Sequence, residues 1–194
     1  MKARWVAVLM PLVLVLSGCG YNRIQELDEN AEANKSQIEV QLQRRADLIP
    51  NLVQTVQRFA QQEEAVFTNV ANARAGLLGA IQSGDPRAMA NANEAVGSAL
   101  GRLLAIAEAY PELKSDQTFL RLQDELAGTE NRIAVSRRDY NEAVQQYNTL
   151  IRRFPTAVTA KVIGADEREY FEVTDAANRE APNVEFAPPG GKEP

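Results

Sequence analysis

The sequence predicts an all-α protein, an elongated antiparallel four-helix bundle of the up-and-down type with an extended C-terminal strap and a mobile tail. Apolar residues recur every three or four positions through most of residues 24–154, as on one face of a helix. Ser83-Gly84-Asp85-Pro86 and Tyr110-Pro111 interrupt this pattern as turns between helices do. After Pro155 the helical pattern ends.

The predicted organisation has four parts, and the first is a lipoprotein signal peptide at residues 1–18. Lys2 and Arg4 precede an apolar run at residues 5–16, which is shorter than the roughly 20 residues a bilayer span needs. Its length is typical of a signal-peptide core. The run ends in Leu16-Ser17-Gly18-Cys19, which resembles a bacterial lipobox, so Cys19 is the predicted lipid attachment site. The alternative is an ordinary signal peptide followed by an unrelated cysteine.

A lipid on Cys19 predicts a protein of the bacterial cell envelope, held in a membrane and facing the periplasm. Several acyl chains on one cysteine anchor a protein firmly, whereas a single chain does so only marginally. Gly20 follows the cysteine. In enterobacterial-type sorting, an aspartate at that position favours retention at the inner membrane, so Gly20 favours the outer membrane.

Composition argues against an enzyme. The chain has no histidine, one cysteine and a formal net charge of -5. Ser-His and Cys-His nucleophile pairs, imidazole or cysteine metal sites and disulfides are therefore excluded, and nucleic acid is not an expected partner. No Gly-rich phosphate loop or nucleophile-type turn is present, and neighbouring carboxylates such as Glu63 and Glu64 do not face each other on a helix. We expect no cofactor.

The bundle is predicted to span residues 19–154. The first helix covers residues 21–45, and Asp47 caps a second helix at residues 48–82 with Pro50 in its first turn. One long helix kinked at Pro50 is the alternative. Asp85 and Pro86 begin a third helix at residues 86–109. The fourth helix, at residues 115–154, has a stripe with near-heptad spacing that is typical of a coiled-coil seam. The stripe consists of Phe119, Leu122, Leu126, Thr129, Ile133, Ser136, Tyr140, Val144, Tyr147, Ile151 and Phe154.

The C-terminal region is predicted to form a strap at residues 155–181 and a flexible tail at residues 182–194. Residues 158–163 are β-branched and apolar, and Tyr170, Phe171 and Val173 form a second apolar group. We expect the strap to lie along the bundle, with a short helix after Asp166.

Several sequence blocks, spread in order along the chain, resemble those of one known family. They are Gln43-Arg44-Arg45-Ala46-Asp47-Leu48-Ile49-Pro50-Asn51-Leu52-Val53, Ala73-Arg74, Ala109-Tyr110-Pro111-Glu112-Leu113, Thr129-Glu130-Asn131-Arg132-Ile133, Tyr140-Asn141, Tyr147-Asn148, Phe154-Pro155 and Tyr170-Phe171. With these blocks the chain resembles LemA-family proteins. The resemblance implies a membrane-associated antiparallel helical bundle with no established enzymatic activity. Many members look anchored by a transmembrane helix, which a lipobox replaces here.

The candidate interaction residues fall into two groups. The first group surrounds the predicted joint between the first two helices, at residues 43–53. One interpretation of this group is a binding surface, and the other is a set of caps and salt bridges that hold the two helices together. On the last helix, we expect the tyrosines to pack in the core with their hydroxyls reaching partners at its edge, and Asn141 and Asn148 to bond across helices. The first group is Arg44, Arg45, Asp47, Pro50, Asn51 and Arg74, and the second is Asn131, Arg132, Tyr140, Asn141, Tyr147 and Asn148.

These observations predict a non-enzymatic envelope lipoprotein that acts as a helical scaffold or adaptor for protein partners. The alternative is a module that binds a small molecule or a cell-wall fragment in a groove between helices. A heptad seam can also pair between chains, which would give a homo-oligomer.

Overall fold

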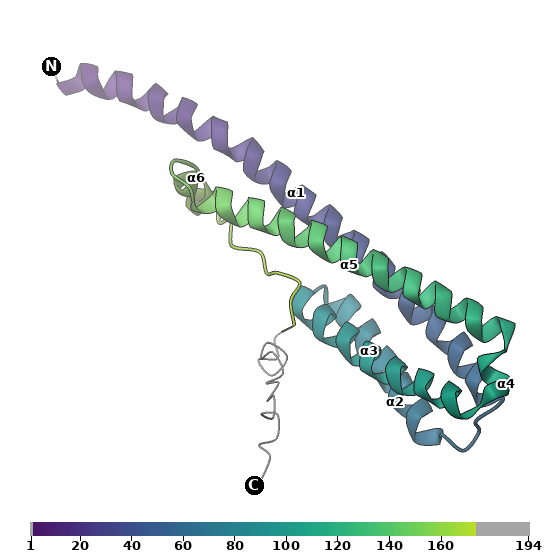
Figure 1. The fold of residues 1–194 in the computed structure, drawn as a ribbon. Helices are drawn as coiled ribbons and strands as arrows, with labels where there is room; N and C mark the ends of the chain where they lie inside the picture. Colours follow the sequence, from purple (N-terminus) through teal and green to yellow (C-terminus); the bar gives the residue numbers. More distant parts are fainter. Residues whose placement is uncertain (1, 174–194) are drawn as a thin grey trace, which may run out of the picture.

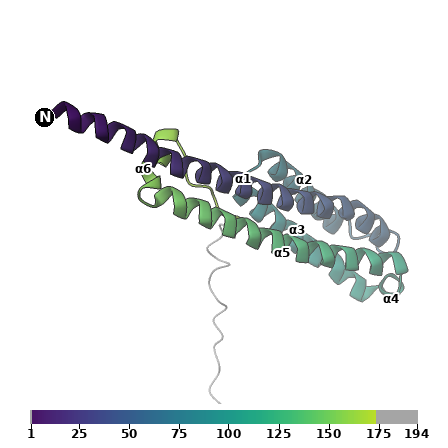
Figure 2. The ribbon, with the colours of Figure 1, turned by 90° about the horizontal axis from the view of Figure 1, so that it is seen from above.

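The computed structural model describes the backbone of residues 2–173 and the side chains of residues 20–173. Within that range the chain forms helices and no strand, which confirms the all-α prediction. The long helices run side by side and make an elongated body, and the first part of α1 extends beyond it (Figures 1 and 2). The helices are α1 (Lys2–Gln57), α2 (Glu64–Ser83), α3 (Pro86–Ala109), α4 (Pro111–Lys114), α5 (Gln117–Arg152) and α6 (Thr156–Ile163).

The predicted break between the first two helices is in the wrong place. α1 continues through Asp47 and Pro50, as the single-helix alternative expected there, but it ends at Gln57 and does not run on to residue 82. Asp47 caps no helix, because it lies inside α1, and its carboxylate accepts a hydrogen bond from Gln43 Nε2, 2.9 Å away and one turn earlier. The chain turns instead at residues 58–63, next to the polar stretch 61–64 in which no residue can continue the apolar stripe.

The remaining helix ends follow local sequence signals. Gly84 ends α2 in the left-handed conformation, with φ of 68°, which glycine adopts without strain. The side chain of Asp85 accepts a hydrogen bond from the Arg87 backbone 2.9 Å away, and α3 spans the predicted residues. Asp116 caps α5 in the same way at the Phe119 backbone. α5 is therefore two residues shorter at each end than predicted.

The core lies along α1. α1 packs along α5, α2 packs along α3, and α1 also touches α2 and α3, whereas α3 and α5 do not pack along each other. The predicted stripe of α5 is buried from Phe119 to Ile151, apart from the half-buried Ser136. Phe154 is the exception, with 86% of its surface exposed, because α5 ends at Arg152 before the stripe can return to the core.

The predicted strap has a different structure. Its β-branched start forms α6, so a short helix comes before Asp166, and residues 166–173, the described part of the strap after it, contain none. Gly164 ends α6 with φ of 71°, and residues 165–173 then run as an extended segment back along the bundle (Figure 1). The predicted tail and the predicted strap beyond Val173 lie outside the described residues, as do the side chains of the predicted signal peptide and Cys19. In the part that was described, no helix is both long and apolar enough to span a bilayer.

Candidate functional site

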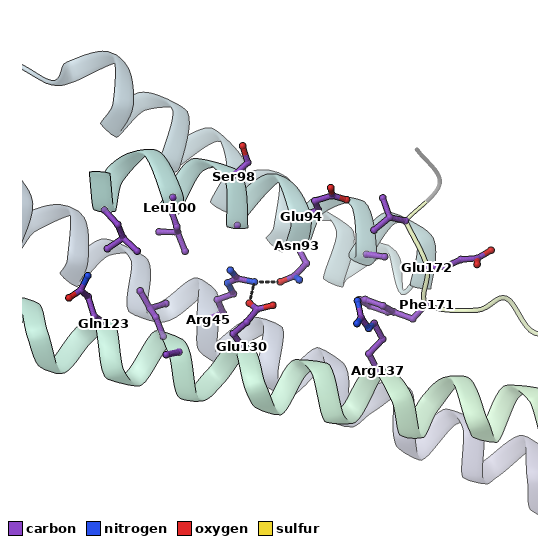
Figure 3. Close-up of a pocket in the computed structure, with 17 residues that line it drawn as sticks. Arg45, Asn93, Glu94, Ser98, Leu100, Gln123, Glu130, Arg137, Phe171 and Glu172 are labelled. Atoms are coloured by element: carbon purple, nitrogen blue, oxygen red, sulfur yellow. Dashed lines mark hydrogen bonds and ion pairs between the residues drawn. The ribbon is translucent and has the colours of Figure 1, made fainter. Parts of the chain in front are cut away.

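An open groove lies between α3 and α5, on the side where these two helices do not pack together. It has a volume of about 840 Å³. α1 contributes Arg45 to it, and the end of the extended segment closes one end with Phe171 and Val173 (Figure 3). Leu100 and Leu104 on α3 and Leu126 on α5 make its walls largely apolar.

The groove continues toward α4 in a second hollow of about 460 Å³. The two hollows share Gly101, Leu104 and Gln123. Along α3 the lining runs from Ala90 to Glu108, which at 1.5 Å per residue is about 27 Å. The combined feature, called the α3–α5 groove below, is therefore elongated.

Arg45 joins three helices at the bottom of this groove. Its Nη1 donates to Asn93 Oδ1 on α3, 2.6 Å away, and pairs with Glu130 on α5 (Figure 3). Only 7% of the Arg45 surface is exposed, whereas the Glu130 side chain is half exposed. A buried guanidinium needs such a partner, because its charge loses the solvation of water.

The electrostatic balance at Arg45 is not complete. Burial lowers the pKa of its guanidinium, and the carboxylate of Glu130 acts in the opposite direction. Its Nε is buried and has no hydrogen-bond acceptor among the described residues. Gly97 lies beside the guanidinium, since a Cβ on this glycine would be 3.7 Å from Nη2. Arg45 therefore lines the groove with one N–H still able to donate.

The other residues of the predicted joint do not converge with Arg45. Arg44, Asp47 and Asn51 are exposed, and Pro50 is half buried within α1. Arg74 on α2 donates its Nε hydrogen to the backbone oxygen of Ala46, 2.8 Å away. The residues of this block therefore do not gather at one site. Arg45 faces the groove, while Arg74 joins α2 to α1.

Asn131 and Arg132 also lie away from the α3–α5 groove. Both are exposed on α5, where they line a small hollow of about 290 Å³ together with Gln41 of α1. The side-chain oxygen of Gln41 is buried without a donor among the described residues. This hollow is small and shallow, and we assign it no function.

Asn141 and Asn148 bind the extended segment, and the hydrogen bonds described for them do not join two helices. Asn148 bonds both the backbone N–H and the carbonyl oxygen of Arg168, each at 2.9 Å. Asn141 does the same to Phe171, accepting from its N–H at 2.8 Å and donating to its oxygen at 3.2 Å. Seven helical residues rise about 10.5 Å and three extended residues about 10 Å, so the two spacings match. The heptad spacing on α5 therefore holds an extended backbone in register.

The two tyrosines complete this attachment. Tyr140 is buried, and its hydroxyl donates to the Glu169 carbonyl oxygen at 2.8 Å, which is the kind of partner at the core edge that the sequence predicted. Burial raises the pKa of Tyr140 to about 12. The Arg168 guanidinium lies 5.9 Å from the ring centre of Tyr147, whose pKa is also raised by burial.

Arg168 extends the attachment from α5 to α1. Its Nε bonds Asp28 at 2.7 Å and its Nη1 bonds Glu32 at 2.9 Å. The hydrogen bond to Asp28 raises the pKa of Arg168. The pKa of Glu32 is lowered, first by its hydrogen bond with Lys35 and then by that with Arg168. The extended segment is thus bonded to both α5 and α1.

Sequence reasoning missed the partners of these side chains. Glu130 was part of a matching family block, and Asp28 and Glu32 are one turn apart on a helix, which is a detectable signal. The sequence contains no comparable signal for Asn93, which lies in an alanine-rich helix, or for Arg168, which lies among carboxylates. Among the described residues there is no group of three or more acidic or cysteine side chains placed to hold a metal ion.

Comparison with known proteins shows which family this chain resembles in sequence. The model of the LemA family matches residues 34–186. Magnetosome protein MamQ 2 of Paramagnetospirillum magneticum and magnetosome protein MamQ of Magnetospirillum gryphiswaldense are each 32% identical to this chain. Each match covers 81% of this chain and 66% of the relative, so the chain spans slightly less than two thirds of their length. None of these descriptions denotes an enzyme. The chain belongs to the LemA family.

Proposed function

We propose that this protein is a non-enzymatic scaffold of the bacterial envelope that is lipid-anchored at Cys19 and binds an amphipathic helix of a partner protein in the α3–α5 groove. The α3–α5 groove is the observation that carries the proposal. It is open along one side, its walls are largely apolar, and it has the length of about five helical turns.

The shape of the groove favours a helix as its occupant. Gly97, Ser98 and Gly101 on α3 have small side chains, or none, and a Cβ on Gly101 would meet nothing within 4 Å. Small residues allow a helix backbone to approach closely. The lining residues of α3 include the carboxylates of Glu94 and Glu108 and no basic side chain. The expected partner helix therefore has an apolar face with lysine or arginine along the edge next to α3.

A second candidate function rests on Arg45. Its buried Nε lacks an acceptor, and a carboxylate or carbonyl oxygen entering the groove could bond to it. This feature supports a binding module for a small molecule or a cell-wall fragment. Glu130 already balances the charge of Arg45, however, so we rank this candidate below a protein partner.

A photo-cross-linker placed in the groove tests the main proposal. Ser98 is exposed and lines the groove, whereas Ser36 is exposed on α1 outside it. We would replace each in turn with a benzoylphenylalanine and irradiate intact envelopes. One defined protein captured at position 98 and absent at position 36 is the expected result. The same set of proteins at both positions would argue against the groove.

A groove-filling substitution gives an independent test with a matched control. Gly101→Phe fills the α3–α5 groove, while Gly76→Phe adds the same side chain to an exposed position of α2 with nothing within 4 Å. Both proteins should fold. We expect Gly101→Phe to abolish the cross-link at position 98 and Gly76→Phe to leave it unchanged. For the second candidate, an Arg45→Ala variant that keeps its helicity and melting temperature yet loses a cell-wall fragment would reverse the ranking.

The anchor is tested separately. Mass spectrometry of the mature N-terminus should find an acylated Cys19 and no residues before it, and a Cys19→Ala variant should leave the membrane fraction or remain uncleaved. Separation of inner and outer membranes then tests the weaker expectation from Gly20. Recovery of the acylated protein wholly in the inner membrane would contradict that expectation.

A further inference from the structure

We propose that α6 and the residue preceding it form a second membrane contact, in which an exposed apolar patch lies on the lipid surface beside the N-terminal anchor. The patch consists of Phe154, Val158 and Val162, and is called the α6 patch below. This inference rests on the anchoring part of the proposed function and is independent of the α3–α5 groove.

The α6 patch contains the two most exposed large apolar side chains among the described residues. Phe154 is 86% exposed, Val162 81% and Val158 59%. Val158 and Val162 are one turn apart and therefore share one face of α6, and Phe154 lies in the turn that leads into this helix. Ala160, on the other face, is buried against the cluster that contains Ile24 and Ile151. α6 thus has one apolar side buried against the bundle and a second apolar side that is uncovered.

The position of α6 brings this face to the anchor. A Cβ on Gly20 would lie 3.2 Å from Thr156 Cγ2 and 3.6 Å from Thr159 Oγ1, so α6 lies directly against α1 at Gly20. Gly20 is the residue after Cys19 and follows the apolar run at residues 5–16. Figures 1 and 2 both show α6 at the end of the body from which the first part of α1 emerges. An anchor at this point holds the membrane surface within reach of α6.

Charge beside the patch points to lipid as its occupant. Arg153 and Lys161 are exposed next to Phe154 and Val162, respectively, and Arg152 pairs with Glu167 at 3.4 Å. Apolar side chains combined with lysine and arginine are typical of segments that lie in a membrane interface containing anionic lipid. A second copy of the chain would instead bring the basic residues of two patches together, so we regard it as the competing outcome.

A single tryptophan at position 154 measures this contact directly. The only native tryptophan is Trp5, which lies in the predicted signal peptide, so the mature lipoprotein should contain no tryptophan, and Trp5→Phe removes the signal of any uncleaved precursor. Phe154→Trp in the full chain then reports on the patch. Val135→Trp is the matched control, because Val135 is 49% exposed on α5 away from α6. Each protein is reconstituted in vesicles of phosphatidylethanolamine and phosphatidylglycerol that contain lipid with brominated acyl chains.

We expect blue-shifted emission and several-fold stronger bromine quenching at position 154 than at position 135. Serine at both Val158 and Val162 should reduce the quenching at position 154. Equal quenching at the two positions overturns the proposal, and so does a blue shift at position 154 without bromine quenching, which would indicate a protein neighbour. Flotation of the same vesicles reports anchoring by itself, so loss of the anchor and failure of the α6 contact are distinguishable.

Discussion

Arg74 donates its Nε hydrogen to the backbone oxygen of Ala46, the acceptor that Pro50 leaves without a partner. In an α-helix the carbonyl of residue 46 accepts from the N–H of residue 50, and proline has none. Ala46 is fully buried, so water cannot replace this donor. The guanidinium of α2 supplies it across the helix contact, 2.8 Å away. This bond explains how α1 continues through a proline.

The Arg74 bond predicts a coupling with Pro50. Arg74→Met should lower the free energy of unfolding by about 1–3 kcal/mol, because it leaves a buried carbonyl unsatisfied. In a Pro50→Ala background the backbone N–H of residue 50 is restored, so Arg74→Met should lower the free energy of unfolding by less. Chemical denaturation of the four proteins measures this cycle. Equal costs of Arg74→Met in the two backgrounds would show that the bond does not compensate for the proline.

Asn148 should control the attachment of the extended segment. Asn148→Ala removes both hydrogen bonds to the Arg168 backbone, and we expect faster amide exchange at Arg168 and a loss of about 1–3 kcal/mol. Gln146→Ala is the control, since this exposed side chain bonds only Glu142 on its own helix. Its effect should stay within about 0.5 kcal/mol. Unchanged exchange at Arg168 in Asn148→Ala would contradict the structure.

The ion pairs of Arg168 should make stability sensitive to acid. The pKa of Glu32 is lowered in the folded protein from its usual 4.5, so its contribution is present above that value and is lost as the pH falls through the lowered pKa. Both partner carboxylates are partly exposed, so Arg168→Met should cost only about 1 kcal/mol per pair or less. Urea denaturation should show this cost shrinking between neutral pH and about pH 3. A cost independent of pH would exclude the pairs as its origin.

Tyr140 should make the stability of the protein sensitive to alkaline pH as well. Its pKa is raised by burial from 10.0 to about 12, so its contribution to stability is complete below pH 10 and is lost as the pH rises toward 12. The ultraviolet difference titration of the native protein against Tyr140→Phe isolates this one tyrosine. We expect its midpoint near 12 and release of the extended segment over the same range. A midpoint near 10 would mean that the hydroxyl is solvated.

Glu130 should stabilise the protein more than an exposed ion-pair partner does. Glu130→Gln leaves the buried Arg45 charge without its counter-charge, and we expect a loss of about 1–3 kcal/mol, less than for a fully buried pair because Glu130 is half exposed. Glu167→Gln, which breaks the exposed pair with Arg152, is the control and should cost about 0–1 kcal/mol. Thermal or chemical unfolding measures both. Similar losses would mean that water solvates Arg45.

The helices were largely predictable, because their signals are local. Asp85, Pro86 and Gly84 act on backbone groups within a few residues, and the stripe from Phe119 to Ile151 follows from helical geometry. Pro50 misled the prediction for a physical reason. A proline breaks a helix unless a distant group supplies the missing hydrogen bond, and that group, Arg74, is twenty-four residues away in the chain.

By itself, the sequence determined the all-α class, the turn at Gly84–Pro86, the buried face of α5 and the family, since each depends on residue spacing or on short blocks. Tertiary structure decided that α3 and α5 stay apart, that Arg45 bridges their groove and that Asn141 and Asn148 hold the extended segment. These features depend on pairs far apart in the chain, such as Arg168 with Asp28. A single sequence shows which groups can bond, but the relative placement of its helices selects the pairs that do.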